Sequence, residues 1–305
     1  MNKVWVTGDA VVDLIPDSEI SYLKCPGGAP ANVAVAIARL EGKASFLGRV
    51  GDDPLGRFMC QTLKDEGVDT QELLLDADKR TSTVIVDLDD SGERSFTFMV
   101  KPSADQFFHR DDIPEFKPRE WLHFCSIALA NEPSRSATFE AAQSLKVKGG
   151  FISFDPNLRE EVWTNTDEIK TTILKAIEIA DVVKFSDDEL MFLTDCSDLQ
   201  KSLETLELSS QKLVVITQGA KGALVVFNGQ QKLITGMAVT PIDTTGAGDA
   251  FVGGMLAQLS RLEIWNEWEV IEKAISWGNA CGALATTQKG AMTALPTLSQ
   301  LQEIL

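Results

Sequence analysis

Histidine, paired cysteines and long apolar runs are scarce in this chain. Its 305 residues include two histidines, His109 and His123, and five scattered cysteines without a Cys-x-x-Cys pair. A hydrolytic triad is not favoured, because His123 lies in the apolar, strand-like run WLHFCSIAL, where a packed histidine is the commoner outcome. The odd cysteine set predicts free thiols in a reducing cytoplasm rather than a disulfide framework or a zinc site.

Positive charge is also in short supply. The 45 Asp and Glu residues outnumber the 28 Lys and Arg residues, which gives a net charge of −17. This excess repels nucleic acids and anionic lipid headgroups, so neither is expected as a partner. The N-terminal apolar run is broken by Gly8 and Asp9, unlike that of a signal peptide, and no run reaches membrane-spanning length. With 44% hydrophobic residues, the sequence predicts a soluble globular protein.

Short apolar runs alternate with helical patterns for most of the length. The strand-like segments Val4–Thr7, Ala44–Leu47 and Phe151–Phe154 each precede a segment with helical periodicity. This order predicts an α/β fold in which helices cover both faces of a mostly parallel sheet. Functional groups in such folds gather at the C-terminal ends of the strands.

Two predicted hairpins interrupt the alternation. TVIVDLDDSGERSFTFMV has apolar residues at alternate positions on either side of a turn at Asp90–Gly92, and ALVVFNGQQKLI has a turn at Asn228–Gly229. Segments 10–24 and 82–101 together predict a small sheet that projects as a lid from a single domain, residues 1–305. So small a sheet needs its apolar face covered by a ligand or another subunit.

The stretch DTTGAGDAF, Asp243–Phe251, separates a predicted strand at Val239–Ile242 from a predicted helix. That helix has apolar residues on one face: Val252, Met255, Leu256 and Leu259. The unpaired N–H groups and dipole of a helix N-terminus favour an anion, and glycines let the anion approach the backbone. The pattern alone fits equally well a plain helix start with Asp249 near the cap.

A second glycine pair, Gly27 and Gly28 in PGGAPAN, also precedes a helix, and Asn32 lies in its first turn. Upstream, Asp9 and Asp13 follow the first strand. Carboxylates that accept from neighbouring hydroxyls, together with an amide, suit a polyol ligand. Each residue is also common in ordinary turns, so it is the combination that indicates a polyol site.

PGGAPANVA and DTTGAGDAF resemble the two signature segments of the ribokinase-like carbohydrate kinases. The likeness continues through GRVGDDPLG, FDPNLREEVW, VVKFSDDEL, ITQGAKGALV and TTQKGAMTALP, in the order of the family's fructokinase branch. The resemblance implies a ribokinase-like three-layer α/β sandwich with a small projecting β-sheet lid. Separately, the projecting hairpin predicts that the lid covers the sugar and pairs with its counterpart in a homodimer. It also implies transfer of the γ-phosphate of ATP to a sugar primary hydroxyl, with D-fructose giving fructose 6-phosphate. Kinases of aminoimidazole riboside and of 2-keto-3-deoxygluconate are alternatives, and a non-catalytic sugar sensor is an alternative of another class.

The resemblance also assigns site residues. Asp249 matches the catalytic base, and the backbone N–H groups of Gly246, Ala247 and Gly248 match the anion hole. The matches to sugar-binding positions are Asp9, Asp13, Gly28, Asn32 and Arg159. Arg159 can equally be read as a surface arginine.

For the nucleotide, the resemblance implies the residues Lys184, Glu189, Thr217, Gly219, Gly222 and Asn279. Glu189 would help organise Mg²⁺, although Ser186 stands where the family often has asparagine. A monovalent-cation site suited to K⁺ is implied beside the anion hole, with the groups Asp243, Thr245 and the carbonyls of Ala285, Gln288 and Gly290.

Overall fold

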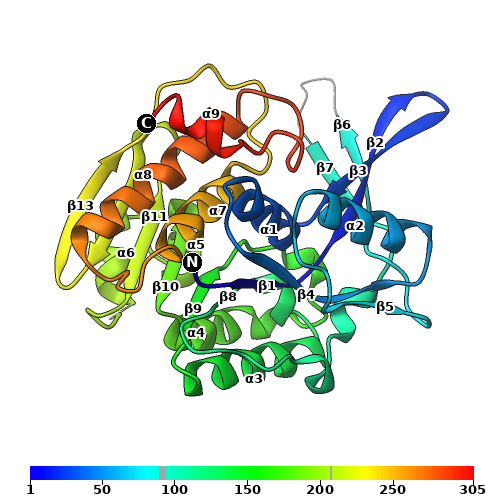
Figure 1. Cartoon of the computed structure of the whole chain (residues 1–305), viewed down its shortest axis with the longest axis horizontal. Coiled ribbons are helices and arrows are strands. Elements are labelled where there is room, and N and C mark those ends of the chain that lie inside the picture. The colour runs from blue at the N-terminus through cyan, green and yellow to red at the C-terminus, as the bar shows by residue number, and fades with distance from the viewer. Residues whose placement is uncertain (89–93, 207) are drawn as a thin grey trace.

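The computed structural model describes residues 1–88, 94–206 and 208–305, which form three layers around a central sheet (Figure 1). The strands of this sheet are β1 (Val4–Thr7), β4 (Ala44–Gly51), β5 (Leu73–Asp76), β8 (Trp121–Cys125), β9 (Phe151–Asp155), β10 (Val182–Ser186), β11 (Leu213–Thr217), β12 (Gly222–Phe227) and β13 (Gln230–Thr235). Among the described residues, the order is β13-β12-β11-β10-β9-β8-β1-β4-β5. The pairs β11–β12 and β12–β13 are antiparallel, and the other pairs are parallel. The ends of the parallel strands therefore meet at one edge of the sheet.

Helices cover both faces of the sheet, as the alternation of strands and helices predicts. One face packs against α1 (Ala29–Arg39), α2 (Pro54–Asp65), α7 (Ala247–Leu259), α8 (Trp268–Ala285) and α9 (Leu298–Gln302). The other packs against α3 (Ser134–Val147), α4 (Ile169–Ile179), α5 (Asp187–Thr194) and α6 (Leu199–Thr205). Strands β1 and β8 are buried throughout, which explains why their sequences are mostly apolar. The predicted α/β fold class is confirmed.

Helix α7 is not amphipathic as predicted, because it is buried on all sides from Asp249 to Leu259. It packs between α1 and α8. A Cβ at Gly253 would lie 2.3 Å from Ala36 Cβ, and one at Gly254 would lie 2.8 Å from Cys281 Sγ. The two glycines thus allow a helix to approach on either side.

The segment before α7 is also different from the prediction, since Val239–Ile242 is not a strand. Its β-branched residues suggested one, but the chain here runs past the end of α8. The backbone N–H groups of Ile242 and Asp243 both donate to Thr286 O, at 2.7 and 3.1 Å. These bonds to a helix end take the place of pairing with a strand.

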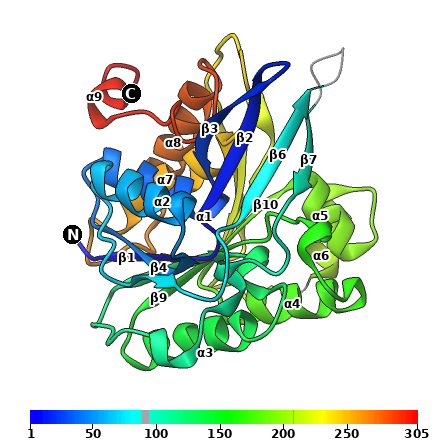
Figure 2. The same ribbon diagram turned by 90° about the vertical axis from the view of Figure 1, so that its right-hand side faces the viewer.

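A second sheet stands away from the three layers (Figure 2). It contains β2 (Val11–Ser18), β3 (Ser21–Gly27), β6 (Thr83–Leu88) and β7 (Arg94–Phe98), in the order β3-β2-β6-β7. The predicted turn at Asp90–Gly92 lies outside the described residues. The other predicted hairpin is present, with positive φ angles of 50° at Asn228 and 72° at Gly229, as a type I′ turn requires.

Three further sequence expectations concern the whole chain. All five cysteines are free thiols in the part of the chain that the structure describes. His123 is fully buried and packed, with Nδ1 3.1 Å from Ser153 Oγ, and burial lowers its pKa to about 3. None of the described helices has the length and apolarity to cross a membrane.

Candidate active site

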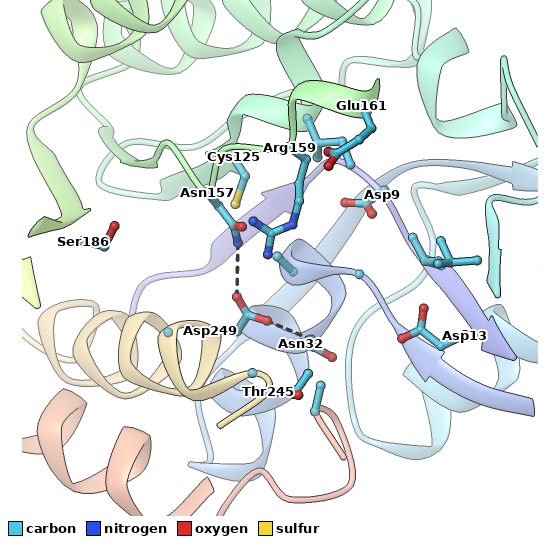
Figure 3. Close-up of a pocket in the computed structure, with 18 of the residues that line it drawn as sticks. Asp9, Asp13, Asn32, Cys125, Asn157, Arg159, Glu161, Ser186, Thr245 and Asp249 are labelled. Carbon is cyan, nitrogen blue, oxygen red and sulfur yellow. Dashed lines mark hydrogen bonds between the residues drawn. The ribbon is translucent and has the colours of Figure 1, made fainter. Parts of the chain in front are cut away.

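A cavity of about 470 Å³ lies where the C-terminal ends of the parallel strands meet the small sheet (Figure 3). The ends of β1, β9 and β10, the first turn of α1 and the start of α7 all contribute to it. The small sheet adds side chains from three of its strands, which are Val11, Asp13, Val84 and Phe98. The two signature segments, far apart in sequence, therefore face one cavity.

Asp249 lies in the first turn of α7 with its carboxylate held from two sides (Figure 3). Asn32 Nδ2 donates to Oδ2 at 2.8 Å, and Asn157 Nδ2 lies 3.5 Å from Oδ1. Burial raises the pKa of Asp249 to about 6, while the Asn32 hydrogen bond and the charge of Lys184 act in the opposite direction. Near neutral pH the group is therefore an ionised carboxylate that can accept a proton.

Two buried oxygens in the same cavity have no hydrogen-bond partner among the described residues. They are Asp9 Oδ1 and Asn32 Oδ1, and both side chains line the cavity. Burial, with the nearby charge of Asp105, raises the pKa of Asp9 to about 8. Because an unpartnered buried acceptor is unfavourable, these oxygens favour a ligand that brings hydroxyl donors.

Two positively charged residues, Arg159 and Lys184, line the cavity. Lys184 Nζ lies 3.6 Å from where a Cβ of Gly248 would be, so it faces the turn that starts α7. Burial disfavours the ammonium form, but the Asp155 charge outweighs that effect and raises the pKa of Lys184. The site thus keeps a fixed positive charge beside the backbone N–H groups of the helix terminus.

Glu189 lines the cavity but is also tied to the backbone. Its Oε2 accepts the N–H of Ser186 at 2.8 Å and its Oε1 accepts the N–H of Leu158 at 3.1 Å. Ser186 Oγ in turn accepts the N–H of Glu189, which makes a capping box at the start of α5. Ser186 therefore serves as a helix cap where the family often has asparagine.

A second cavity, of about 460 Å³, lies on the other side of the α7 N-terminus. Its walls are mostly small or apolar residues and backbone, including the predicted nucleotide residues Thr217, Gly219, Gly222 and Asn279. Thr244 and Gly248 line both cavities. A group bound against the start of α7 can therefore be reached from either cavity.

Two of these residues shape the second cavity through the backbone. Gly222 has φ 104°, and a Cβ there would lie 2.1 Å from Ile234 O. Asn279 Nδ2 donates to Ile234 O at 3.0 Å and to Thr235 O at 3.2 Å. These contacts hold the end of β13 against α8 and keep the cavity open.

Three of the residues predicted to bind a monovalent cation, Asp243, Thr245 and Gly290, are joined by hydrogen bonds behind the turn. Asp243 Oδ1 accepts from the backbone and hydroxyl of Thr245, and Oδ2 accepts from Gly290 N at 2.9 Å. In the described part of the chain, the carbonyl oxygens of Ala285, Gln288 and Gly290 have no hydrogen-bond donor. This set of oxygens fits a K⁺ ion, which prefers carbonyl and carboxylate ligands.

The structure brings most of the predicted residues together, but it divides them between the two cavities differently from the prediction. The sugar-site residues all line the first cavity, but so do Lys184 and Glu189, which were assigned to the nucleotide. The sequence reasoning missed Asn157, Glu161, Cys125 and Thr244. Asn157 follows β9 closely in the quoted segment FDPNLREEVW, but no local pattern in that segment distinguishes it.

This geometry defines a class of protein, an α/β protein in which two cavities meet at a helix N-terminus suited to an anion. Residues 1–298 match the family model for pfkB family carbohydrate kinases. The chain belongs to the pfkB family of carbohydrate kinases, which confirms the family inferred from the two signature segments.

Individual relatives cover nearly the whole chain. A fructokinase from Vibrio alginolyticus is 65% identical over 99% of this chain and 98% of its own length. Aminoimidazole riboside kinase from Salmonella typhimurium is 47% identical over 100% of this chain and 95% of its own.

A solved structure gives the same picture. The crystal structure of a Vibrio cholerae fructokinase with fructose, ADP and a calcium ion has a TM-score of 0.96 and 61% identity, and the match covers 100% of this chain and 99% of that one. A double mutant of that enzyme, with fructose, ADP and a potassium ion, has a TM-score of 0.95 and 60% identity, and the match covers 100% and 98%.

Proposed function

We propose that this protein transfers the γ-phosphate of ATP to the primary hydroxyl of D-fructose, giving fructose 6-phosphate and ADP. One observation carries the proposal. The buried Asp249 carboxylate lies in the first cavity, at the turn where Thr244 and Gly248 also line the second. The fructokinases among the relatives, including one structure with fructose and ADP, support the same assignment.

In the proposed reaction each of these groups has a role. Asp249 accepts the proton of the sugar hydroxyl as its oxygen attacks the γ-phosphate. The N–H groups of Gly246 and Gly248 stabilise charge on the phosphoryl oxygens, and Lys184 adds a positive charge. The N–H of Ala247, the third predicted donor, is directed instead to Thr244 O at 3.2 Å. A loose phosphoryl-transfer transition state needs little base strength, so the main contribution of Asp249 is to position the hydroxyl.

Sugar recognition uses the other polar groups of the first cavity. Asp9 Oδ1 and Asn32 Oδ1 accept from sugar hydroxyls, which removes the cost of leaving them unpaired. Asp13 and Arg159 complete the polar wall, while Val84 and Phe98 cover the carbon skeleton from the small sheet.

Two ions belong to the proposal. Mg²⁺ on the ATP phosphates would neutralise charge during transfer, and Glu189 would help to hold its water molecules. K⁺ would bind the oxygen cluster around Asp243 and support the turn that precedes α7.

The small sheet is proposed as a lid over the sugar and as a dimer interface. Its inner face lines the first cavity, whereas Ile20, Tyr22, Leu23 and, just after β7, Met99 are exposed apolar residues. A lid that excludes water prevents wasteful hydrolysis of ATP, and a second copy would bury the exposed residues. A monomeric mass by light scattering at working concentration would argue against the dimer. A cytoplasmic location stays a prediction, supported by the cysteine pattern.

Aminoimidazole riboside kinase is the second candidate, because the relative of that name is 47% identical. The deciding experiment measures ADP release from MgATP, with and without K⁺, for fructose, aminoimidazole riboside, ribose, 2-keto-3-deoxygluconate and no sugar. We expect a fructose-selective signal that K⁺ increases.

The controls use two acids that both lie in the first turn of a helix. Asp249→Ala should lower kcat by at least about 1,000-fold, and exposed Asp188→Ala should leave it unchanged. Saturation by the riboside at far lower concentration than fructose would move the substrate assignment. Sugar binding without ADP release would favour a sugar sensor instead.

A further inference from the structure

An ion pair is buried beneath the anion-binding turn. Lys184 Nζ donates to both carboxylate oxygens of Asp155, at 2.9 and 3.1 Å, and the two side chains are 8% and 3% exposed. Lys184 lines the first cavity, whereas Asp155 is not among its lining residues in the described part of the chain. Asp155 therefore acts on the site only through other residues.

The sheet register places the pair on the side that faces α7. Val182 pairs with Ser153 and Val183 with Phe154 in the parallel strands β9 and β10. Side chains alternate between faces, so Lys184 shares the face of Val182, which packs in the cluster with α1, α7 and α8. Asp155 is the last residue of β9 and Lys184 is the middle residue of β10, and both lie below the start of α7.

A second contact fixes the orientation of the Asp155 carboxylate. Its Oδ1 accepts the backbone N–H of Asn157 at 3.2 Å, in a turn where Asn157 has a left-handed φ of 36°. Asparagine tolerates this conformation better than most residues. With one oxygen held by the backbone, the carboxylate presents a fixed partner to Lys184.

We propose that Asp155 is a positioning residue for phosphoryl transfer, which holds the Lys184 ammonium against the anion-binding turn at Gly248. The inference deepens the proposed kinase function and rests on it for its kinetic consequences. A charge on a flexible lysine would have to be oriented at each turnover, whereas one fixed by a buried partner is already in place. Electrostatics agrees, because the Asp155 charge raises the pKa of Lys184 against the opposing effect of burial.

The chain offers a matched control at the other end of the same strands. Asp181, just before β10, accepts Lys146 Nζ at 2.9 Å and the backbone N–H of Ile152 at 2.8 Å. Like Asp155, it joins a lysine to a backbone N–H, but it lies at the edge of the sheet away from the cavities. Asp155→Asn should lower kcat by at least about 10-fold with less than about a 3-fold change in the KM for fructose. Asp181→Asn should change neither.

A variant that breaks a buried ion pair can fail to fold, because it leaves one charge uncompensated. The double variant Asp155→Asn with Lys184→Met removes both charges and keeps the test decisive. Since Asp155 acts through Lys184, the double variant should be no slower than Lys184→Met alone. A double variant as fast as the unmodified enzyme, or one slowed by the product of the two single effects, would overturn the proposal.

A readout without turnover separates this proposal from the proposed function. In ligand-free protein treated with acetic anhydride, mass spectrometry should show Lys184 acetylated at least about 10-fold faster in Asp155→Asn, because less of the amine stays protonated. Exposed Lys64 is the internal standard and should not change. Faster acetylation of Lys184 in a protein without kinase activity would keep the positioning role and reject the kinase. Unchanged acetylation of Lys184 would overturn the positioning role, whatever happens to turnover.

Discussion

The two cavities on either side of the α7 N-terminus are lined by different kinds of residues. The first is walled by charged and amide side chains, among them Asp9, Asn32, Arg159 and Asp249. The second is walled by glycines, alanines and other mostly uncharged residues, with Asn279 turned to the backbone. A sugar is recognised by directed hydrogen bonds to hydroxyls, which need side chains, whereas a nucleotide site can rely on shape and backbone N–H groups.

This contrast implies opposite kinds of sensitivity. The first cavity should be damaged by removing atoms, because a truncated side chain leaves sugar hydroxyls without partners. The second should be damaged by adding atoms, because its walls are already close to the backbone. Three experiments test the contrast, from the largest expected effect to the smallest.

Removing atoms from the first cavity should have the largest effect. Asp9→Ala should raise the KM for fructose about 10- to 100-fold, since a buried hydrogen-bond partner is lost, with a smaller effect on kcat. Asp9→Asn keeps one acceptor and should raise the KM less. Initial-rate kinetics against fructose measure both variants, and exposed Asp65→Ala serves as the control. Equal KM values for Asp9→Ala and the unmodified enzyme would remove Asp9 from the sugar site.

Adding atoms to the second cavity should have an intermediate effect that depends on position. A Cβ at Gly222 would lie 2.1 Å from Ile234 O, whereas one at Gly219 would meet nothing within 4 Å, and both residues have positive φ. Gly222→Ala should therefore raise the KM for ATP at least about 10-fold and lower the melting temperature, whereas Gly219→Ala should carry only about 1 kcal/mol of backbone strain. Similar ATP kinetics for the two variants would contradict the idea that shape governs this cavity.

The smallest effect should be a change in pH dependence at the junction of the cavities. Asp249 must be ionised to accept a proton, so kcat/KM should fall as the pH drops through its pKa of about 6. The Asn32 hydrogen bond lowers this pKa, so Asn32→Leu should move the acid limb of the profile to higher pH. Asn165→Ala, at an exposed asparagine, should leave the limb in place. A limb that stays put or moves to lower pH in Asn32→Leu would exclude this role.

The sequence predicted best what depends on local pattern. The alternation of strands and helices led to the fold class, and the signature segments led to Asp249 and Asn32, which the structure places 2.8 Å apart across 217 positions of the chain. The sequence-based prediction was wrong where contacts with neighbouring elements outweigh the local secondary-structure propensity. The β-branched segment Val239–Ile242 bonds to the end of α8, and α7 is buried on every side instead of one.

Residues whose position depends on the assembled sheet were the hardest to predict. Asn157 and Asp155 follow or end a strand without any unusual local pattern. They matter because the parallel sheet brings β9 and β10 beneath the start of α7, which puts Asn157 near Asp249, 92 positions away. No periodicity in the sequence around Asn157 or around Asp249 indicates that the two residues lie close together.

The glycine pair in α7 has a consequence for how the protein tolerates mutation. Gly253 and Gly254 lie four and five positions after Asp249, about 6 to 8 Å further along the helix axis. Any side chain there would collide with Ala36 or Cys281 and push apart the helices that fix the start of α7. A saturation-mutagenesis map of activity should therefore have two separate intolerant regions, one around the cavities and another along the middle of α7. In the second, variants would lose activity through steric crowding alone, at residues that line neither cavity.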